Sequence, residues 1–364
     1  MKILQIIPSM HGGGAEKFVI DLSNEFSKND EVIICSLYNI KEDMFMLNML
    51  SSKIKIITLN KKPGLDLHLF VRLYKIIKEE QPDVINTHLR ALLYSILPIV
   101  FTNIPFFHTV HNMAENETGQ INRKIYKLLF KFFNVKPISI SNKVLESVHK
   151  IYGKEYSIMI ENGVQQPRIT NKNKSVKDEI NLYKMNSKTK VFLSIGRITE
   201  QKNHKMLVQV FSNLINNGEN IILLIIGQDT SKKKFFEKEL KLLIKDKIFL
   251  LGMKENIADY LYYSDAFCLS SLYEGLPITL LESLAMGIIP ICTPAGGIPD
   301  VIDNQVGLIS NDFSLLNYKH EVEKFLKMKE EKISYMKKEG ISLYLSKYCI
   351  ETTAINYKKI YFDV

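Results

Sequence analysis

Cysteine is scarce in this sequence of 364 residues, which contains only four. They lie far apart, and three of them occupy apolar runs that are typical of buried strands; the four are Cys35, Cys268, Cys292 and Cys349. Disulfide-dependent extracellular proteins and structural zinc sites use closer, more regular cysteine spacings. The cysteine pattern therefore argues against a disulfide framework and against a zinc site.

Arginine is also scarce, although the formal net charge is +9. Only five of the 48 basic residues are arginine, and base readout in nucleic acids relies on arginine. Residues 1–165 carry 20 basic and 16 acidic side chains, and the remainder carries 28 and 23, so no basic domain or tail stands out. The charge pattern predicts no nucleic-acid partner, and it leaves an anionic membrane surface as a possible contact.

Long apolar runs are missing as well. The nearest candidate, segment 91–107, contains Pro98, Asn103 and Pro105 and is shorter than the ~20 apolar residues that a membrane-spanning helix needs. We expect a core helix followed by a core strand there. The N-terminal apolar run, 1–8, is too short for a signal peptide. These features predict a cytoplasmic protein.

The sequence does contain a regular alternation of strand-length apolar runs and helix-length amphipathic stretches. Its 46% hydrophobic and 24% charged residues are typical of a globular protein, and its length suffices for two domains. The alternation predicts an α/β fold with doubly wound parallel sheets in two Rossmann-like domains. The predicted strands are 3–8, 32–37, 54–59, 84–87, 106–110, 137–140, 191–195, 221–226, 248–251, 266–269 and 288–291, with a polar connection around 165–190.

Segment 121–136 interleaves basic residues with leucine and phenylalanine and has no acidic residue. Two interpretations fit this composition. In one, a helix packs on a sheet and its lysines point into water. In the other, the helix makes a peripheral contact with anionic lipid.

Two carboxylates, Glu274 and Glu282, are separated by seven residues in an otherwise apolar run. Pro277 fits the first turn of a helix, so Glu274 is expected in a loop and Glu282 on the second helical turn. The helical neighbours of Glu282 four residues away are Ile278 and Met286, which cannot screen its charge. Because an unpaired carboxylate is costly to bury, we expect Glu282 to face a polar ligand in a cleft.

Two loops in the first half follow predicted strands, and ligands of open parallel sheets bind beyond the carboxyl ends of strands. The run GGGAE at 12–16 lets the backbone approach a phosphate or sugar closely, and the next helix offers its N–H groups. A simple tight turn is the alternative, because Lys17 replaces the third glycine of a dinucleotide fingerprint. His111, after strand 106–110, is placed for hydrogen bonding or acid/base chemistry, or else is structural.

A third loop follows the predicted strand 191–195. It begins with Gly196 and Arg197, and Lys202 lies five residues further on. An arginine fork and a lysine point charge beyond a buried strand suit a diphosphate. The alternative is a pair of ordinary surface charges.

These motifs, taken in order, resemble one family. They are GGGAE at 12–16, HTVHN at 108–112, ENGV at 161–164, Gly196-Arg197 with Lys202, EGLP at 274–277 with LESLAMG at 281–287, and TPAGG at 293–297. The set is similar to the family 4 glycosyltransferases, which are retaining enzymes of GT-B fold, with two Rossmann-like domains that face each other across a cleft. The resemblance covers nearly the whole chain, and its second-domain motif is specific.

The resemblance implies a division of labour between two domains. Residues 1–165 would form the acceptor-side domain and residues 166–344 the domain that binds the nucleotide sugar. A C-terminal helix at about 345–364 would cross back to the first domain.

The resemblance also implies roles for individual residues. Arg197 and Lys202 would hold the donor diphosphate, Glu282 the ribose hydroxyls, and Glu274 the hydroxyls of the transferred sugar, where it would also stabilise positive charge near the anomeric carbon. His111 would lie beside the sugar and the acceptor. Further binding residues would come from the same motifs: Gly13, Gly14, Glu16, Asn162, Gly196, Gly275, Leu276 and Pro277.

No Asp-x-Asp motif, which many nucleotide-sugar enzymes use to hold a metal, occurs in the sequence. Cationic side chains and a helix N-terminus can stabilise the leaving diphosphate without a metal. We therefore expect a metal-independent enzyme without a cofactor. The sequence does not identify a general base.

The leading hypothesis is a retaining transferase that moves a hexose or N-acetylhexosamine from a UDP-sugar to a bacterial surface glycan, such as a capsule, O-antigen or lipopolysaccharide. The acceptor would be lipid-linked, and the enzyme cytoplasmic and peripheral on the inner face of the membrane. Alternatives are a soluble acceptor, a non-catalytic nucleotide-sugar-binding partner subunit, and an NAD-dependent dehydrogenase. The missing Gly-x-Gly-x-x-Gly spacing and the Glu274–Glu282 motif disfavour the dehydrogenase.

Overall fold

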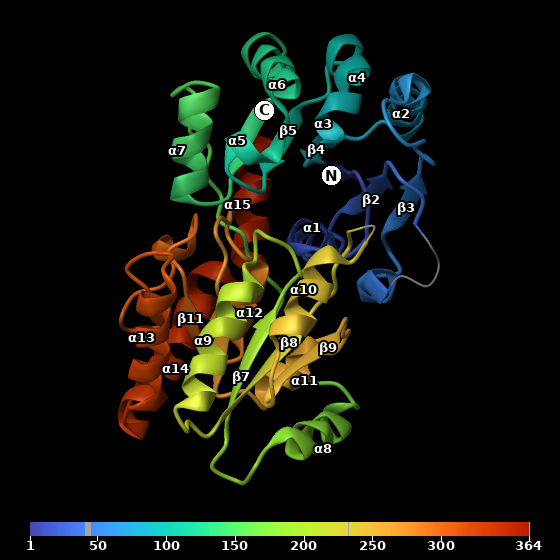
Figure 1. Cartoon of the computed structure of the whole chain (residues 1–364). Helices are drawn as coiled ribbons and strands as arrows, with labels where there is room; N and C mark the ends of the chain where they lie inside the picture. Colours follow the sequence, from blue (N-terminus) through green and yellow to red (C-terminus); the bar gives the residue numbers. More distant parts are fainter. Residues whose placement is uncertain (41–44, 232, 364) are drawn as a thin grey trace. The chain divides into compact units, whose positions relative to one another are not determined.

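The computed structural model describes residues 1–40, 45–231 and 233–363. The chain divides into two compact units (Figure 1). The first unit comprises Met1–Val164 and Tyr348–Val364, and the second comprises Gln165–Lys347. Each unit contains one six-stranded sheet in which all pairings are parallel, so the predicted fold class of two doubly wound α/β sheets is confirmed.

The sheet of the first unit has the strand order β3-β2-β1-β4-β5-β6. Its β1, β4 and β5 are buried along nearly their whole length, which explains why they appear in the sequence as continuous apolar runs. The strands are β1 (Lys2–Ile7), β2 (Glu31–Ser36), β3 (Lys55–Thr58), β4 (Val84–His88), β5 (Phe106–Val110) and β6 (Lys136–Ser139). The chain runs outward from β1 to β3 and then returns to β4 beside β1, so the topological switch point lies between β1 and β4.

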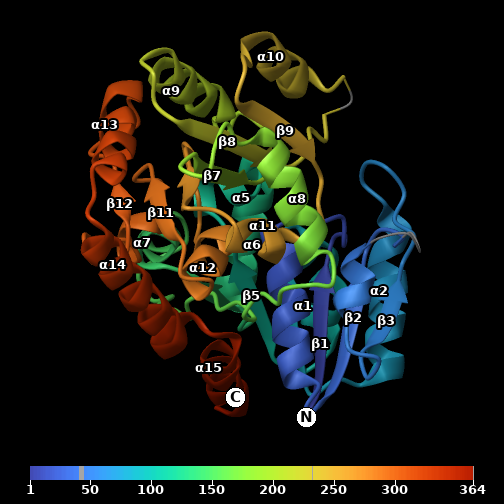
Figure 2. The same ribbon diagram turned by 90° about the horizontal axis from the view of Figure 1, so that it is seen from below.

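Helices cover this sheet. Helix α2 packs with α4, α3 with α6, α5 with α7, and α1 with α15. The helices of the unit are α1 (Gly14–Phe26), η1 (Phe45–Met49), α2 (Leu67–Glu80), α3 (Ala91–Tyr94), α4 (Ile96–Phe101), α5 (Ala114–Glu117), α6 (Gln120–Phe132), α7 (Asn142–Ile151) and α15 (Ile350–Phe362). Figure 2 shows α1 and α2 beside strands β1 to β3.

Segment 91–107 differs in detail from its prediction. Two short helices, α3 and α4, replace the expected single core helix, and β5 follows as predicted. The break lies at Ser95, whose backbone N–H bonds to Leu92 in a tight turn. Among all residues with assigned structure, no helix combines the length and the apolar character that crossing a bilayer requires.

The sheet of the second unit has the order β12-β11-β10-β7-β8-β9, with its switch point between β7 and β10. Its strands are β7 (Lys190–Ile195), β8 (Ile221–Ile226), β9 (Ile248–Gly252), β10 (Ala266–Leu269), β11 (Ile289–Cys292) and β12 (Leu308–Ile309). Strand β12 was not predicted, because two residues are too few to show a periodicity. The helices are α8 (Asn173–Tyr183), α9 (His204–Asn216), α10 (Phe235–Leu243), α11 (Ile257–Tyr262), α12 (Ile278–Ala285), η2 (Ile298–Asp300), α13 (Leu315–Leu326) and α14 (Glu330–Leu343), and the π-helical turn η3 (Tyr344–Tyr348) leads back to the first unit.

Polar contacts fix the C-terminal helix α15 to the first unit. Thr353 donates its hydroxyl hydrogen bond to the Glu161 carbonyl at 3.0 Å, and the Tyr357 hydroxyl lies 3.0 Å from Thr109 Oγ1 inside the sheet layer. Gly163 lies so close to α15 that a Cβ atom there would be 2.7 Å from the Cys349 carbonyl oxygen. The glycine of the ENGV segment is thus required for the docking of α15.

A methyl group at position 163 tests this contact. We expect Gly163→Ala to lower the free energy of unfolding by about 1–3 kcal/mol, because the backbone of α15 must shift to relieve the overlap. Urea denaturation measures the loss, and hydrogen exchange should show faster exchange in α15. Gly119→Ala is the matched control, since a Cβ at 119 meets no atom within 4 Å, and it should cost less than about 1 kcal/mol. Equal losses in the two variants would contradict the packing account.

Candidate functional site

Three loops of the second unit meet at the carboxyl ends of adjacent strands. They follow β7, β10 and β11, which are neighbours in the sheet at its switch point. The backbone N–H of Leu272 donates to the Gln201 carbonyl at 2.8 Å, and the Gln201 side chain returns a bond of 2.8 Å to the Tyr273 carbonyl. These bonds join the loop after β7 to the loop after β10, so residues 70 positions apart in sequence form one site.

The central contact of this site is an ion pair. Lys202 Nζ lies 2.6 Å from Glu274 Oε1, and the exposed fractions of the two side chains are only 15% and 9%. The sequence predicted both residues as site residues but not their contact. A carboxylate and an ammonium that are both largely withdrawn from water need each other, since either one alone would be buried as an uncompensated charge.

Two glycines, Gly196 and Gly296, leave space for the Lys202–Glu274 pair and its loops. A Cβ at Gly196 would come within 3.2 Å of the Lys202 side chain, whose methylene chain passes over the glycine. A Cβ at Gly296 would lie 1.8 Å from the Glu274 carbonyl oxygen, and Gly296 has the left-handed φ of +54°. The Gly297 N–H also donates to the Gly275 carbonyl at 2.8 Å. The TPAGG segment therefore supports the loop that carries Glu274.

Helix α12 places the second carboxylate. It begins at Ile278, so Pro277 is its N-cap rather than a residue of its first turn, a shift of one position from the prediction. Glu282 lies on the second turn, as predicted, and is 2% exposed. Gly275 and Leu276 are buried in the loop just before the helix, where backbone N–H groups can bind an anion.

The remaining residues of the loop after β7 have different environments. Arg197 is exposed and therefore accessible to a ligand. His204 opens α9 two residues after Lys202, and it is buried. Burial lowers the pKa of His204 to about 3, and the charge of Lys202 acts in the same direction. The loop thus carries cations at Arg197 and Lys202, and the buried imidazole of His204 at the start of α9 is neutral.

In the first unit, the glycine-rich loop connects β1 to α1. Gly13 is the N-cap of α1 and Gly14 its first residue. The carboxylate of Glu16 folds back over the loop, and it would lie 2.6 Å from a Cβ at Gly13. The predicted glycine loop at a helix N-terminus is present, and a ligand phosphate there would meet Glu16 as well as backbone N–H groups.

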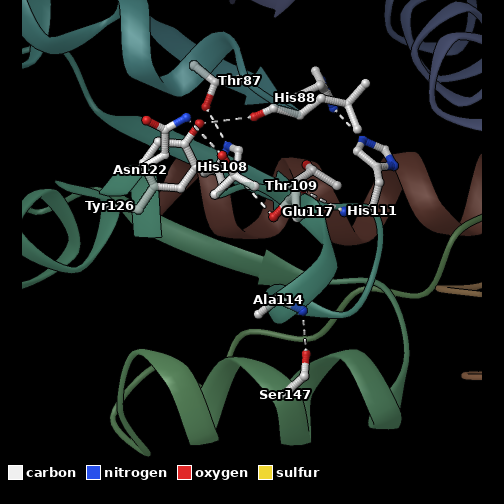
Figure 3. Close-up of polar contacts among 12 residues, drawn as sticks. Thr87, His88, His108, Thr109, His111, Ala114, Glu117, Asn122, Tyr126 and Ser147 are labelled. Atoms are coloured by element: carbon white, nitrogen blue, oxygen red, sulfur yellow. Dashed lines mark hydrogen bonds and ion pairs between the residues drawn. The ribbon is translucent and has the colours of Figure 1, made fainter. Parts of the chain in front are cut away.

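His111 lies just beyond β5 and belongs to a largely buried row of hydrogen-bonded polar side chains (Figure 3). Its Nε2 is 2.8 Å from Nδ1 of His88, and Nε2 of His88 is 2.7 Å from Oε1 of Gln5. Burial lowers the pKa of His111 to about 3 and that of His88 well below its ordinary value. His111 is therefore a neutral imidazole near pH 7, suited to hydrogen bonding and not to carrying charge.

Another histidine, His108, lies within β5. Its Nδ1 is 2.9 Å from Thr87 Oγ1, and its Nε2 is 3.7 Å from the Glu117 carboxylate. Glu117 also accepts the backbone N–H of His111 at 3.2 Å. Glu117 was missed by the sequence reasoning, because two acidic residues in a four-residue helix show no pattern. His88 was missed because the predicted strand ended one residue too early.

Asn162 was predicted to bind substrate, and the structure places it in the ENGV segment that holds α15. Its side chain is 2% exposed, and the neighbouring Glu161 carbonyl accepts the Thr353 hydroxyl. Its role toward substrate stays a prediction.

Within the described part of the chain, no group of three or more histidine, cysteine, aspartate or glutamate side chains is arranged to hold a metal ion. Metal independence stays a prediction.

Segment 121–136 forms helix α6 and the start of β6. Tyr126, Leu129 and Phe130 of α6 are buried against the unit, as the first interpretation of this segment requires. Other apolar side chains of the segment remain exposed: Ile121 at 77%, Leu128 at 54%, Phe132 at 65% and Phe133 at 42%. Exposed lysines accompany them at Lys124, Lys127 and Lys131.

Comparison with family models covers both units. Residues 176–342 match the model described as glycosyl transferases group 1, and residues 12–166 match the model described as glycosyltransferase family 4. Together the two matches include every predicted site residue.

Individual proteins are similar to the chain over most of its length. An uncharacterized glycosyltransferase of Methanocaldococcus jannaschii is 30% identical over 72% of this chain and 73% of its own length. A Campylobacter jejuni enzyme, GalNAc-alpha-(1->4)-GalNAc-alpha-(1->3)-diNAcBac-PP-undecaprenol alpha-1,4-N-acetyl-D-galactosaminyltransferase, is 27% identical over 85% of this chain and 84% of its own. The crystal structure of Anabaena HepE in complex with UDP-glucose superposes with a TM-score of 0.85 at 16% identity, over the full length of both chains, and shows the shared fold.

The low pKa of His204 predicts how stability depends on pH. The unfolded chain binds a proton at this residue below its ordinary pKa of about 6.5, whereas the folded chain does so only near 3. Folding stability should therefore rise with pH between these values, and His204→Gln should reduce the slope near pH 5 by up to about 1.4 kcal/mol per pH unit. Urea denaturation at several pH values measures the slope, and an unchanged slope would show that native His204 is already protonated there.

Proposed function

The chain belongs to the family 4 glycosyltransferases with GT-B fold, and from this membership we propose that it transfers a hexose or N-acetylhexosamine from a UDP-sugar to a glycan hydroxyl with retention of configuration. The observation that carries this proposal is the Lys202–Glu274 pair, with Glu282 buried on the adjoining helix α12. One cation and two carboxylates at a sheet switch point suit a ligand that combines diphosphate with hydroxyl-rich groups.

Each part of the donor would bind to groups of the second unit that match its charge. Its diphosphate is assigned to Lys202 and the exposed Arg197, with help from the backbone N–H groups of Gly275 and Leu276 before α12. Glu282 would accept hydrogen bonds from the ribose hydroxyls. In these assignments the phosphate groups of the donor contact cations or backbone N–H groups at the start of α12. The ribose hydroxyls donate to a carboxylate.

Glu274 is assigned to the sugar and the reacting carbon. When a diphosphate takes Lys202, the Glu274 carboxylate loses its ion partner and can accept hydroxyl groups or stabilise positive charge at the anomeric carbon. The bond from that carbon to the phosphate oxygen breaks, the acceptor oxygen forms the new bond on the same face, and the departing phosphate oxygen takes the acceptor proton. Cationic groups then stabilise the UDP that leaves.

A glycan on a lipid diphosphate is the acceptor class that we favour. The Campylobacter relative acts on an undecaprenol-linked glycan by its name. On this chain, α6 presents Ile121, Leu128 and Phe132 to solvent beside exposed lysines. An apolar surface mixed with positive charge is complementary to an anionic bilayer and less so to a soluble sugar. We assign a peripheral position on such a membrane, with the capsule and lipopolysaccharide class of glycans as product.

The release of UDP from a panel of UDP- and GDP-sugars, with undecaprenyl-diphosphate glycans as acceptors, tests the activity. We expect turnover with a UDP-sugar, and a loss of at least about 100-fold in kcat for Glu274→Ala, which lacks the carboxylate nearest the sugar. Glu321→Ala, on α13, is the control and should keep the activity. Turnover with no donor, while UDP still binds, would support a non-catalytic binding subunit instead.

Sedimentation with vesicles of phosphatidylglycerol and phosphatidylcholine tests the membrane contact. The charge reversal Lys124→Glu/Lys127→Glu on α6 should weaken binding by about 3 kcal/mol or more, since each reversal removes one attraction of about 1 kcal/mol and adds a repulsion. Lys174→Glu/Lys177→Glu on α8 changes the net charge equally and is the control. Equal binding by both variants, or no sedimentation of the unmodified chain, would favour a soluble acceptor.

A further inference from the structure

Three side chains form a hydrogen-bonded chain across the switch point of the first unit. Gln5 belongs to β1, His88 is the last residue of β4, and His111 follows β5, and these strands are neighbours in the sheet. The contacts are short, at 2.7 Å between Gln5 Oε1 and His88 Nε2 and 2.8 Å between His88 Nδ1 and His111 Nε2. Figure 3 shows the rings of His88 and His111 side by side.

The proton positions of these three side chains follow from Gln5, at one end of the hydrogen-bonded row. The Gln5 oxygen can only accept, so His88 Nε2 carries the proton. A neutral imidazole has one N–H, and His88 Nδ1 is therefore an acceptor. His111 Nε2 must then donate to it, which leaves the lone pair of His111 on Nδ1 at the other side of the ring.

The Gln5 amide presents its oxygen to His88. Oε1 of Gln5 lies 2.7 Å from His88 Nε2, where it accepts the ring N–H. The buried Tyr361 hydroxyl also interacts with the Gln5 side chain, which lowers the pKa of Tyr361 against the effect of burial. Gln5 Nε2 itself has no hydrogen-bond partner among the described residues.

The surroundings keep both rings neutral. Phe18 of α1 packs edge-on against His88 and His111, with ring centroids 6.4 Å and 5.6 Å away. The titratable groups facing the pair from other elements are His108 of β5 and Glu117 of α5, and Glu117 binds the His111 backbone N–H rather than the ring. His111 is itself a partly exposed residue, so a ligand can reach it.

We propose that His88 is a positioning residue which, held by Gln5, fixes His111 as the Nε2–H tautomer and so makes His111 Nδ1 a hydrogen-bond acceptor for a sugar hydroxyl. The nature of the ligand rests on the proposed function, whereas the tautomer does not. An Nδ1–H tautomer would instead present a donor to the ligand, and the O–H group of the sugar would have to turn its oxygen toward the ring.

Nuclear magnetic resonance of the full chain labelled with [15N]histidine tests the tautomer directly. Long-range 1H–15N correlations distinguish a protonated from an unprotonated ring nitrogen, and the spectrum of His111→Gln identifies the signals of His111. We expect a neutral Nε2–H form of His111 from pH 5 to pH 8. An Nδ1–H form or a charged ring at pH 7 would overturn the proposal.

Variants of Gln5 and His88 show whether their hydrogen bonds determine the tautomer of His111. His88→Leu and Gln5→Leu should both shift His111 toward a mixture of tautomers, and Gln5→Glu should preserve the Nε2–H form, because a carboxylate oxygen also accepts from His88. Thr87→Val is the matched control. Thr87 lies beside His88 in β4 but bonds to His108 of β5, so its loss should leave the tautomer of His111 unchanged. An unchanged His111 in a folded Gln5→Leu variant would overturn the proposal, even if His88→Leu does not fold.

Kinetics provide a second readout once a donor and acceptor are known. Gln5→Leu should reduce kcat/KM by about tenfold or more while Gln5→Glu stays within about threefold, as expected for a group that orients a ligand-binding imidazole. Absence of turnover in every variant, including the unmodified chain, would count against the proposed function and leave the spectroscopic result standing. Equal kcat/KM for Gln5→Leu and the unmodified chain would overturn the assignment of His111 Nδ1 to the sugar.

Discussion

The ion pair between Lys202 and Glu274 is the interaction on which the candidate site of the second unit depends. It joins loops that follow two neighbouring strands, and both of its members are largely removed from water. Gly196 leaves space for the lysine chain, and Gly296 lets a third loop approach the backbone of Glu274. Because a buried carboxylate needs a compensating charge, the pair stabilises the site in a form in which a diphosphate can replace Glu274 at Lys202 with an equivalent contact.

The first unit also buries polar side chains near its switch point, but these side chains are uncharged. Gln5 of β1, His88 and His111 are joined by hydrogen bonds, and burial keeps both imidazoles neutral. A neutral hydrogen-bonded network costs less to bury than unpaired ions. The two units thus present different chemistry at corresponding places: a cation and carboxylates in the second, and an oriented imidazole and a glycine loop in the first.

Most of the architecture could be predicted from the sequence, because parallel strands buried on both faces leave continuous apolar runs. Strand β12 was not predicted because it has only two residues. The helix predicted in segment 91–107 is interrupted at Ser95, and the local composition shows no turn signal there. Within the candidate site, motifs identified Lys202 and Glu274 separately, but their contact depends on the adjacency of β7 and β10, which single-sequence patterns do not contain. Gln5 was missed because a polar residue in a strand becomes informative only when its neighbours across the sheet are known, and His88 was missed because the predicted strand 84–87 ended one residue before it.

Calorimetric titration of UDP into variants of the pair tests the central claim most directly. If Lys202 binds the diphosphate and Glu274 competes with the diphosphate for Lys202, Lys202→Met should weaken UDP binding by about tenfold or more. Glu274→Gln should bind UDP as tightly as the unmodified chain, or more tightly, because the lysine no longer has to leave a carboxylate. Unchanged affinity in Lys202→Met, or an equal loss in both variants, would contradict the account.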